Sequence, residues 1–109
     1  MFEILNSNHM RIVQGDTAIF NLNIADYNFV EGDIVYFTVK KSIKDKEHVI
    51  QKVVTEFNEN TAKFKLNKED TNIKAGNYIY DIQVSLQDGR VDTIVLPSKF
   101  EVLEGVTCE

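Results

Sequence analysis

The segment from Tyr78 to Gln87 is the longest regular pattern in this sequence. Every second residue is apolar, and from Asp81 onward the residues between them are polar. Side chains two positions apart point to the same face of a β-strand. The pattern therefore predicts a strand with one face on a hydrophobic core and the other in water. The apolar positions are Tyr78, Tyr80, Ile82, Val84 and Leu86.

The residues before this strand predict a tyrosine corner. Asp70 precedes Tyr78 by eight positions and Gly76 precedes it by two. Tyr-x-Tyr then stands where an antibody domain has Tyr-x-Cys, and in such a corner the tyrosine hydroxyl bonds to backbone upstream. Asn67 can cap a single helical turn before the corner, with Asp70 completing a capping box.

Asp88 and Gly89 separate the long strand from a second alternating run, residues 90–96. Asp-Gly is typical of two-residue hairpins in the type I′ conformation, in which both residues need positive φ. We therefore predict an antiparallel hairpin with a type I′ turn. Pro97 has no backbone N–H, so it is expected at a sheet edge or a strand switch.

The rest of the chain repeats this organisation with shorter runs. Turns rich in Asn, Asp and Gly recur at intervals of roughly ten residues, and no helix longer than about one turn is expected. The phase of residues 48–57 is ambiguous and suggests a bulge or burial on both faces. The prediction is an all-β fold, an antiparallel immunoglobulin-like β-sandwich of seven or eight strands, with a small barrel as the alternative. Further strands are expected over residues 2–5, 10–13, 17–24, 34–40, 61–66 and 100–103.

The length of 109 residues fits a single domain over residues 1–109, with residues 104–109 as a short tail. The 43% of hydrophobic residues is enough for a core. Cys108 is the sole cysteine, so no internal disulfide is possible. We expect a free, exposed thiol; the alternative is an intermolecular disulfide.

From its charge and hydropathy, we expect the chain to bind neither nucleic acid nor membranes. The formal net charge is -5, and the twelve Lys and Arg residues are scattered rather than gathered on one face. No run approaches the roughly 18–20 apolar residues needed to span a bilayer. Residues 1–13 do not read as a signal peptide, so we expect a soluble protein made in the cytoplasm.

No catalytic, cofactor-binding or metal site is predicted, and we expect no enzyme. His9 and His48 lie far apart in the sequence, and neither a Zn spacing nor an EF-hand loop occurs. There is also no G-x-S-x-G elbow. Tyr27 and Phe29, beside Gly32, are candidates for an exposed interface pair at one end of the sandwich. The alternative is that these two rings plug the end of the core.

The order of several short motifs resembles the N-terminal domain of the phage baseplate upper protein family, a small tail-associated sandwich of phages and prophages. The resemblance extends from about Met10 to Thr107. The motifs that carry it are Gln14-Gly15-Asp16-Thr17, Val39-Lys40-Lys41, Asp70-Thr71, residues 75–82, residues 89–94, Phe100-Glu101-Val102 and Val106-Thr107.

This resemblance implies a non-catalytic domain that docks onto the tail or baseplate and packs against copies of itself. The expected partners are other phage structural proteins, and the expected location is the host cytoplasm during synthesis and the virion afterwards. The alternative is an immunoglobulin-type binding module that recognises carbohydrate or a host surface through Tyr27 and Phe29.

Overall fold

The computed structural model describes residues 1–106, which form eight strands, one 3-10 turn (Asn6–Asn8) and one short helix, α1 (Lys68–Thr71). The strands are β1 (Phe2–Ile4), β2 (Met10–Val13), β3 (Ala18–Asn23), β4 (Ile34–Lys40), β5 (Ile50–Val54), β6 (Thr61–Leu66), β7 (Gly76–Ser85) and β8 (Val91–Leu103).

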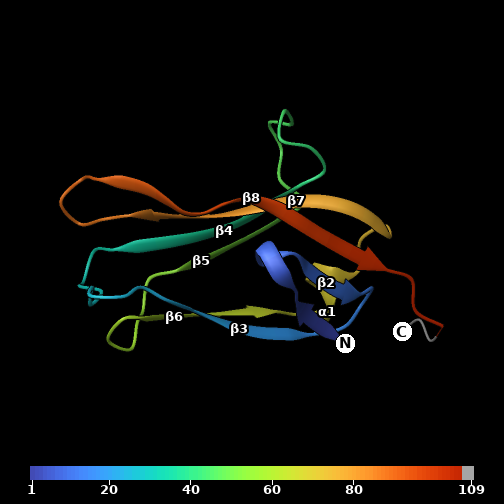
Figure 1. Ribbon diagram of the computed structural model, residues 1–109, viewed down its shortest axis with the longest axis horizontal. Coiled ribbons are helices and arrows are strands. Elements are labelled where there is room, and N and C mark those ends of the chain that lie inside the picture. The colour runs from blue at the N-terminus through green and yellow to red at the C-terminus, as the bar shows by residue number, and fades with distance from the viewer. Residues whose placement is uncertain (107–109) are drawn as a thin grey trace.

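Two sheets face each other (Figure 1). The larger sheet has the order β1-β2-β8-β7-β4-β5, and the smaller one consists of β3 and β6. The neighbours β8, β7 and β4 correspond to the G, F and C strands of immunoglobulin domains, and β5 extends the sheet as C′ does in variable-type domains. The predicted immunoglobulin-like β-sandwich is confirmed.

One strand pair departs from the antiparallel arrangement. β2 runs parallel to β8, with Met10 opposite Phe100 and Val13 opposite Leu103. Parallel strands require a long connection, and here nearly the whole domain lies between the two. A short-range hairpin signal cannot reveal such a pair, because its partners meet only after the sandwich has closed.

Aromatic rings fill the space between the sheets. Phe37 on β4 is fully buried, and its ring centroid lies 5.2 Å from that of Phe20 and 5.9 Å from that of Phe64 on the opposite sheet. Tyr80 and Phe100 contact the same ring within the large sheet, at 5.4 and 6.1 Å. The alternation predicted from Tyr78 to Gln87 is confirmed. Tyr78, Tyr80, Ile82 and Val84 on β7 are buried, and Leu86, just after the strand, is half-buried.

The β7–β8 hairpin is present, but the prediction of a type I′ turn is wrong. The N–H of Leu86 donates to the carbonyl of Arg90 at 2.7 Å, and the N–H of Gly89 donates to the carbonyl of Leu86 at 2.9 Å. Residues 87–89 thus form a three-residue loop, and of Asp88 and Gly89 only Gly89 has a positive φ, +97°. A three-residue loop needs a single left-handed residue, at its last position.

β8 is irregular where it passes Pro97. Tyr80 pairs with Ser98 and Ile82 with Val95, so Leu96 and Pro97 together face one residue of β7. β2 pairs with β8 only from Phe100 onward, and Pro97 therefore lies on a free edge, as predicted.

β5 resolves the ambiguous phase of residues 48–57. It is the outermost strand of the large sheet beside β4, with Ile50 directed into the core. Val49 and Val53 are 44% and 50% exposed, so they lie on the solvent face of the strand. Burial of this segment on both faces is therefore excluded. Phe57, which follows the strand, is partly buried and packs against one end of the core.

Candidate interaction surfaces

Asp70 anchors the short helix to the large sheet. Its carboxylate accepts a hydrogen bond from the backbone N–H of Asn67 at 2.7 Å, which satisfies a donor at the start of α1. The Nζ of Lys52 on β5 lies 2.7 Å from the same carboxylate. Asp70 therefore joins α1 to the edge of the sheet and is engaged in structural contacts.

Tyr78 makes the hydrogen bond of a tyrosine corner. Its hydroxyl donates to the carbonyl of Lys74, four residues upstream, at 2.5 Å. The Nζ of Lys41 lies 4.8 Å from the centre of the Tyr78 ring, and burial raises the pKa of the Tyr78 hydroxyl. Gly76 opens β7 with φ +150°, where a Cβ would lie 3.4 Å from the Nζ of Lys41.

Tyr27 and Phe29 do not form an exposed pair in the single chain, because Phe29 is only 9% exposed. Its ring stacks on Phe57 with centroids 4.1 Å apart, and Tyr27 meets it edge-on at 5.6 Å. The loop between β3 and β4 crosses the end of the sandwich, so both rings cover the core there. The two rings close the end of the core, as the alternative interpretation expected.

Asp33 is a buried charged residue in the loop before β4. Its side chain is 1% exposed and accepts hydrogen bonds from the Tyr27 hydroxyl at 2.5 Å, the Gln87 N–H at 2.8 Å and the Val30 N–H at 3.0 Å. Burial raises its pKa, but these hydrogen bonds outweigh burial, and the pKa lies below the ordinary 3.8. The carboxylate links two loops, and its acceptor sites are used in doing so.

No sequence signal marked the link between the two loops, because Gln87 lies 54 residues from Asp33, whereas Val30 and Tyr27 belong to the same loop as Asp33. The hydrogen bond to Asp33 raises the pKa of the Tyr27 hydroxyl. Gly32, next to Asp33, has φ +100°, and a Cβ there would lie 2.8 Å from the Cγ of Gln87. The two loops are therefore packed closely as well as hydrogen-bonded.

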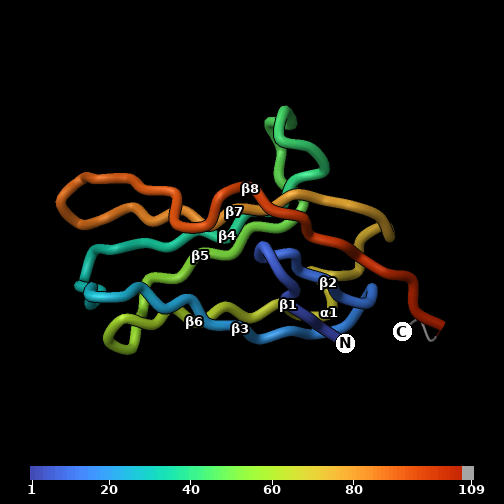
Figure 2. Tube along the Cα trace, viewed as in Figure 1, coloured from blue at the N-terminus to red at the C-terminus, as the bar shows by residue number. Residues whose placement is uncertain are grey.

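The outer face of the large sheet is open to solvent and carries a groove. The segment between β4 and β5 projects from the large sheet on the side away from β3 and β6 (Figure 2). Between this segment and the sheet lies a space of about 400 Å³, within the range of small-ligand sites. Its lining residues are Tyr36, Thr38, Lys40, Ile43, Lys46, His48, Gln51, Ile79, Tyr80, Asp81, Gln83 and Pro97.

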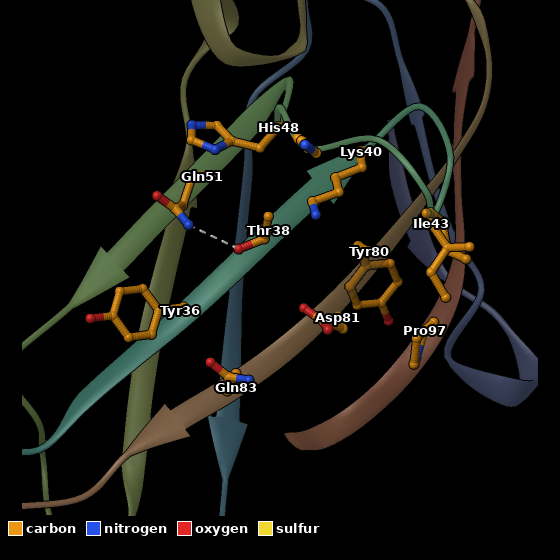
Figure 3. Close-up of a pocket in the computed structure, with 12 residues that line it drawn as sticks. Tyr36, Thr38, Lys40, Ile43, His48, Gln51, Tyr80, Asp81, Gln83 and Pro97 are labelled. Carbon is orange, nitrogen blue, oxygen red and sulfur yellow. Dashed lines mark hydrogen bonds between the residues drawn. The ribbon is translucent and has the colours of Figure 1, made fainter. Parts of the chain in front are cut away.

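Figure 3 shows how the groove is built from β4, β5, β7 and β8 and from the segment between β4 and β5. β4 supplies Tyr36 and Thr38, and β5 supplies Gln51, whose Nε2 donates to the Oγ1 of Thr38 at 3.2 Å. β7 supplies Asp81 and Gln83 on the same face. The arrangement offers one aromatic ring and several hydrogen-bonding groups to a partner in solvent.

Residues 1–106 contain no group of three or more His, Cys, Asp or Glu side chains that could hold a metal ion. In the same part of the chain, no helix is long and apolar enough to cross a membrane. The Nε2 of His9 lies 3.1 Å from a carboxylate oxygen of Glu101, and this contact joins β8 to the turn before β2. Cys108 lies outside the described residues.

The sequence of the chain has no match among known protein families or curated proteins. Among solved structures, the chain is similar to the extracellular domain of mouse leukocyte-associated immunoglobulin-like receptor 1, crystallised as a strand-swapped dimer. The TM-score is 0.45 at 14% sequence identity, over 91% of this chain and 83% of that one.

Proposed function

We propose that this chain is a non-catalytic assembly module of a phage or prophage virion. In this proposal it docks onto other proteins of the tail or baseplate and associates with copies of itself through its β-sandwich. The order of motifs between Met10 and Thr107, which resembles the baseplate upper protein family, supports the virion part of the proposal.

The single observation that carries the assembly role is the open outer face of the six-stranded sheet. The small sheet covers the inner face only, and large apolar side chains remain in solvent around the outer face. Val53 is 50% exposed, Val91 60% and Leu96 71%. Large apolar side chains exposed on one open face of a sheet fit a protein interaction surface.

The free edge of β8 adds to this surface. Its residues before Phe100 pair with β7 alone, so the backbone on the other side has no strand partner within residues 1–106. Free strand edges can pair with another chain, although the irregularity at Pro97 limits the length of such a ladder. The edge therefore fits docking of a side-chain surface better than addition of a long strand.

Purified particles from an induced lysate test the virion role directly. Mass spectrometry of the particles should find the chain, and electron microscopy of particles from a deletion strain should show incomplete tails. Complementation with the wild-type gene is the control for effects on neighbouring genes. Absence of the chain from the particles, together with normal tails after deletion, would overturn the proposal.

A second candidate is a binding module for carbohydrate or a host surface, and the groove on the outer face favours it. Tyr36 offers a ring on which a sugar could stack, and Gln51 and Gln83 offer donors and acceptors for hydroxyl groups. The burial of Phe29 removes the pair first assigned to this role. A glycan array with the wild-type chain and Tyr36→Ala would test it: binding lost in the variant supports the module, and no binding by either removes it.

A further inference from the structure

We infer that two copies of this chain associate through one half of the outer face of the large sheet, here called the neutral half-face. This inference rests on the proposed function, of which it specifies the self-association surface. The neutral half-face consists of Ile34, Tyr36, Thr38, Gln51, Val53, Gln83, Ser85, Val91 and Thr93.

The strand register makes these residues one continuous surface. Tyr36 on β4 lies opposite Val53 of β5 on one side and Gln83 of β7 on the other. Gln83 in turn lies opposite Thr93 of β8, so a single row crosses four strands. Neighbouring rows continue it, with Thr38 beside Gln51.

The neutral half-face has no charged side chain, although 27% of the residues in the chain are charged. The first charges on this face are Asp81, opposite Thr38, and Lys40 at the end of β4. Depletion of charge around aromatic and apolar residues is the compositional mark of an interface core. None of the residues of the half-face is buried in the single chain, so the whole of it is open to a partner.

The net charge of -5 favours this half-face over other surfaces for contact between identical chains. Two copies that met through acidic surface would bring like charges together and would bury some of them without partners. A neutral contact avoids both costs. Salt screens the repulsion from the rest of each chain, over a Debye length of about 8 Å at physiological ionic strength.

The side chains also suit a contact with themselves. In a two-fold pair the same patch is used on both copies, so groups near the axis meet their own counterparts. Gln51 and Gln83 each carry a donor and an acceptor and can therefore pair with a copy of themselves, which a lysine or an aspartate cannot do. Val53 and Val91, 50% and 60% exposed, supply apolar area beside them. A second copy of the chain is thus the occupant that this chemistry fits best.

The size of the neutral half-face predicts a weak contact. It spans five residues of β4 and three residues on each of β5, β7 and β8. At about 3.3 Å per residue and about 4.8 Å between strands it covers roughly 225 Å², well under the roughly 800 Å² that each partner buries in a standard interface. The projecting segment between β4 and β5 can add area through Ile43, which is 64% exposed. We therefore expect a dimer that forms with rising concentration and dissociates on dilution.

Sedimentation equilibrium of the chain from micromolar to millimolar concentration, with reductant present, tests the inference. Val53→Glu places a carboxylate on the half-face and should raise the dimer dissociation constant at least about tenfold. Ile19→Glu is the matched control, because Ile19 is 56% exposed on β3 of the other sheet. Gln83→Lys, a second variant on the half-face, should weaken the dimer in the same way if Val53→Glu does not fold.

The outcomes separate this inference from the proposed function. If the wild-type chain dimerises and the half-face variants dimerise as strongly, the inference is overturned while self-association stands on another surface. If the wild-type chain stays monomeric at millimolar concentration, both the inference and self-association are overturned, and docking in the virion is decided by the particle experiment. Loss of the dimer in Ile19→Glu as well as in Val53→Glu would also contradict the assignment.

Discussion

The hydroxyl of Tyr27 donates a 2.5 Å hydrogen bond to the buried carboxylate of Asp33. Because the same carboxylate accepts from the backbone of Gln87, this pair ties the loop that covers the core's end to the β7–β8 hairpin. The neutral half-face borders on that hairpin, through Ser85 and Val91 at its base. The Asp33 network therefore holds in place the end of the sheet on which the proposed contact depends.

Replacing Asp33 by alanine should destabilise the fold strongly. The backbone N–H groups of Val30 and Gln87 would lose a charged acceptor, and hydrogen bonds to charged groups contribute about 1.5–3 kcal/mol each. We expect a loss of at least about 2 kcal/mol in the free energy of unfolding, measured by urea denaturation. Asp92→Ala, at an exposed position on β8, is the control and should change stability by less than about 0.5 kcal/mol.

The lowered pKa of Asp33 predicts a contribution to acid unfolding. A carboxyl with a lower pKa in the folded chain binds its proton more weakly there. The stability that it contributes is therefore complete above the ordinary pKa of 3.8 and is lost as the pH falls through the lowered pKa. The stability advantage of the wild-type chain over Asp33→Asn should therefore shrink as the pH falls from above 3.8 through the lowered pKa of Asp33. Thermal melts of both proteins at a series of pH values would measure this difference, and a gap that stays constant would contradict the prediction.

Tyr78→Phe should keep the packing of β7 and lose the hydrogen bond to the Lys74 carbonyl, at a cost of about 1–2 kcal/mol. Tyr36→Phe is a matched control, because the Tyr36 hydroxyl has no hydrogen-bond partner within residues 1–106. Chemical denaturation of both variants gives the comparison. Equal stabilities would mean that the tyrosine corner contributes nothing measurable.

A second tyrosine hydroxyl, that of the more deeply buried Tyr80, can be tested in the same way. This hydroxyl donates to the carbonyl of Asn8 at 2.5 Å, and burial raises its pKa to about 12. Tyr80→Phe would leave the Asn8 carbonyl without this donor and should loosen the turn before β2. Amide hydrogen exchange should then speed up over residues 5–9 more than over β4, and uniform exchange rates would argue against the link.

Two glycines should respond differently to alanine. Gly89 has φ +97° and open space around it, so Gly89→Ala costs only backbone strain, about 1–2 kcal/mol. Gly32→Ala combines a similar strain with a contact of 2.8 Å to Gln87, so its loss should be larger. Gln87→Ala in the Gly32→Ala background should recover part of that loss, which a double-mutant cycle measures. If Gln87→Ala recovers no stability, backbone strain alone accounts for the destabilisation by Gly32→Ala.

Local patterns in the sequence were enough to predict the β-sandwich architecture. A two-residue period needs no knowledge of the partner strand, so the alternation from Tyr78 onward identified both the central strand and its core face. The capping position of Asp70 and the hairpin at Gly89 were also local, since their partners lie within a few residues. Local patterns of this kind are readable because chain stereochemistry limits what nearby residues can do.

Features whose partners lie far apart in the chain become visible once the chain is folded. The parallel pairing of β2 with β8, the burial of Phe29 and the hydrogen bond from the Gln87 N–H to Asp33 depend on how the two sheets close. The neutral half-face is likewise a product of register, because Tyr36 and Gln83 become neighbours only when β4 pairs with β7. A shift of one residue would turn a strand's side chains to the opposite face, and burial of the core fixes that register in the folded chain.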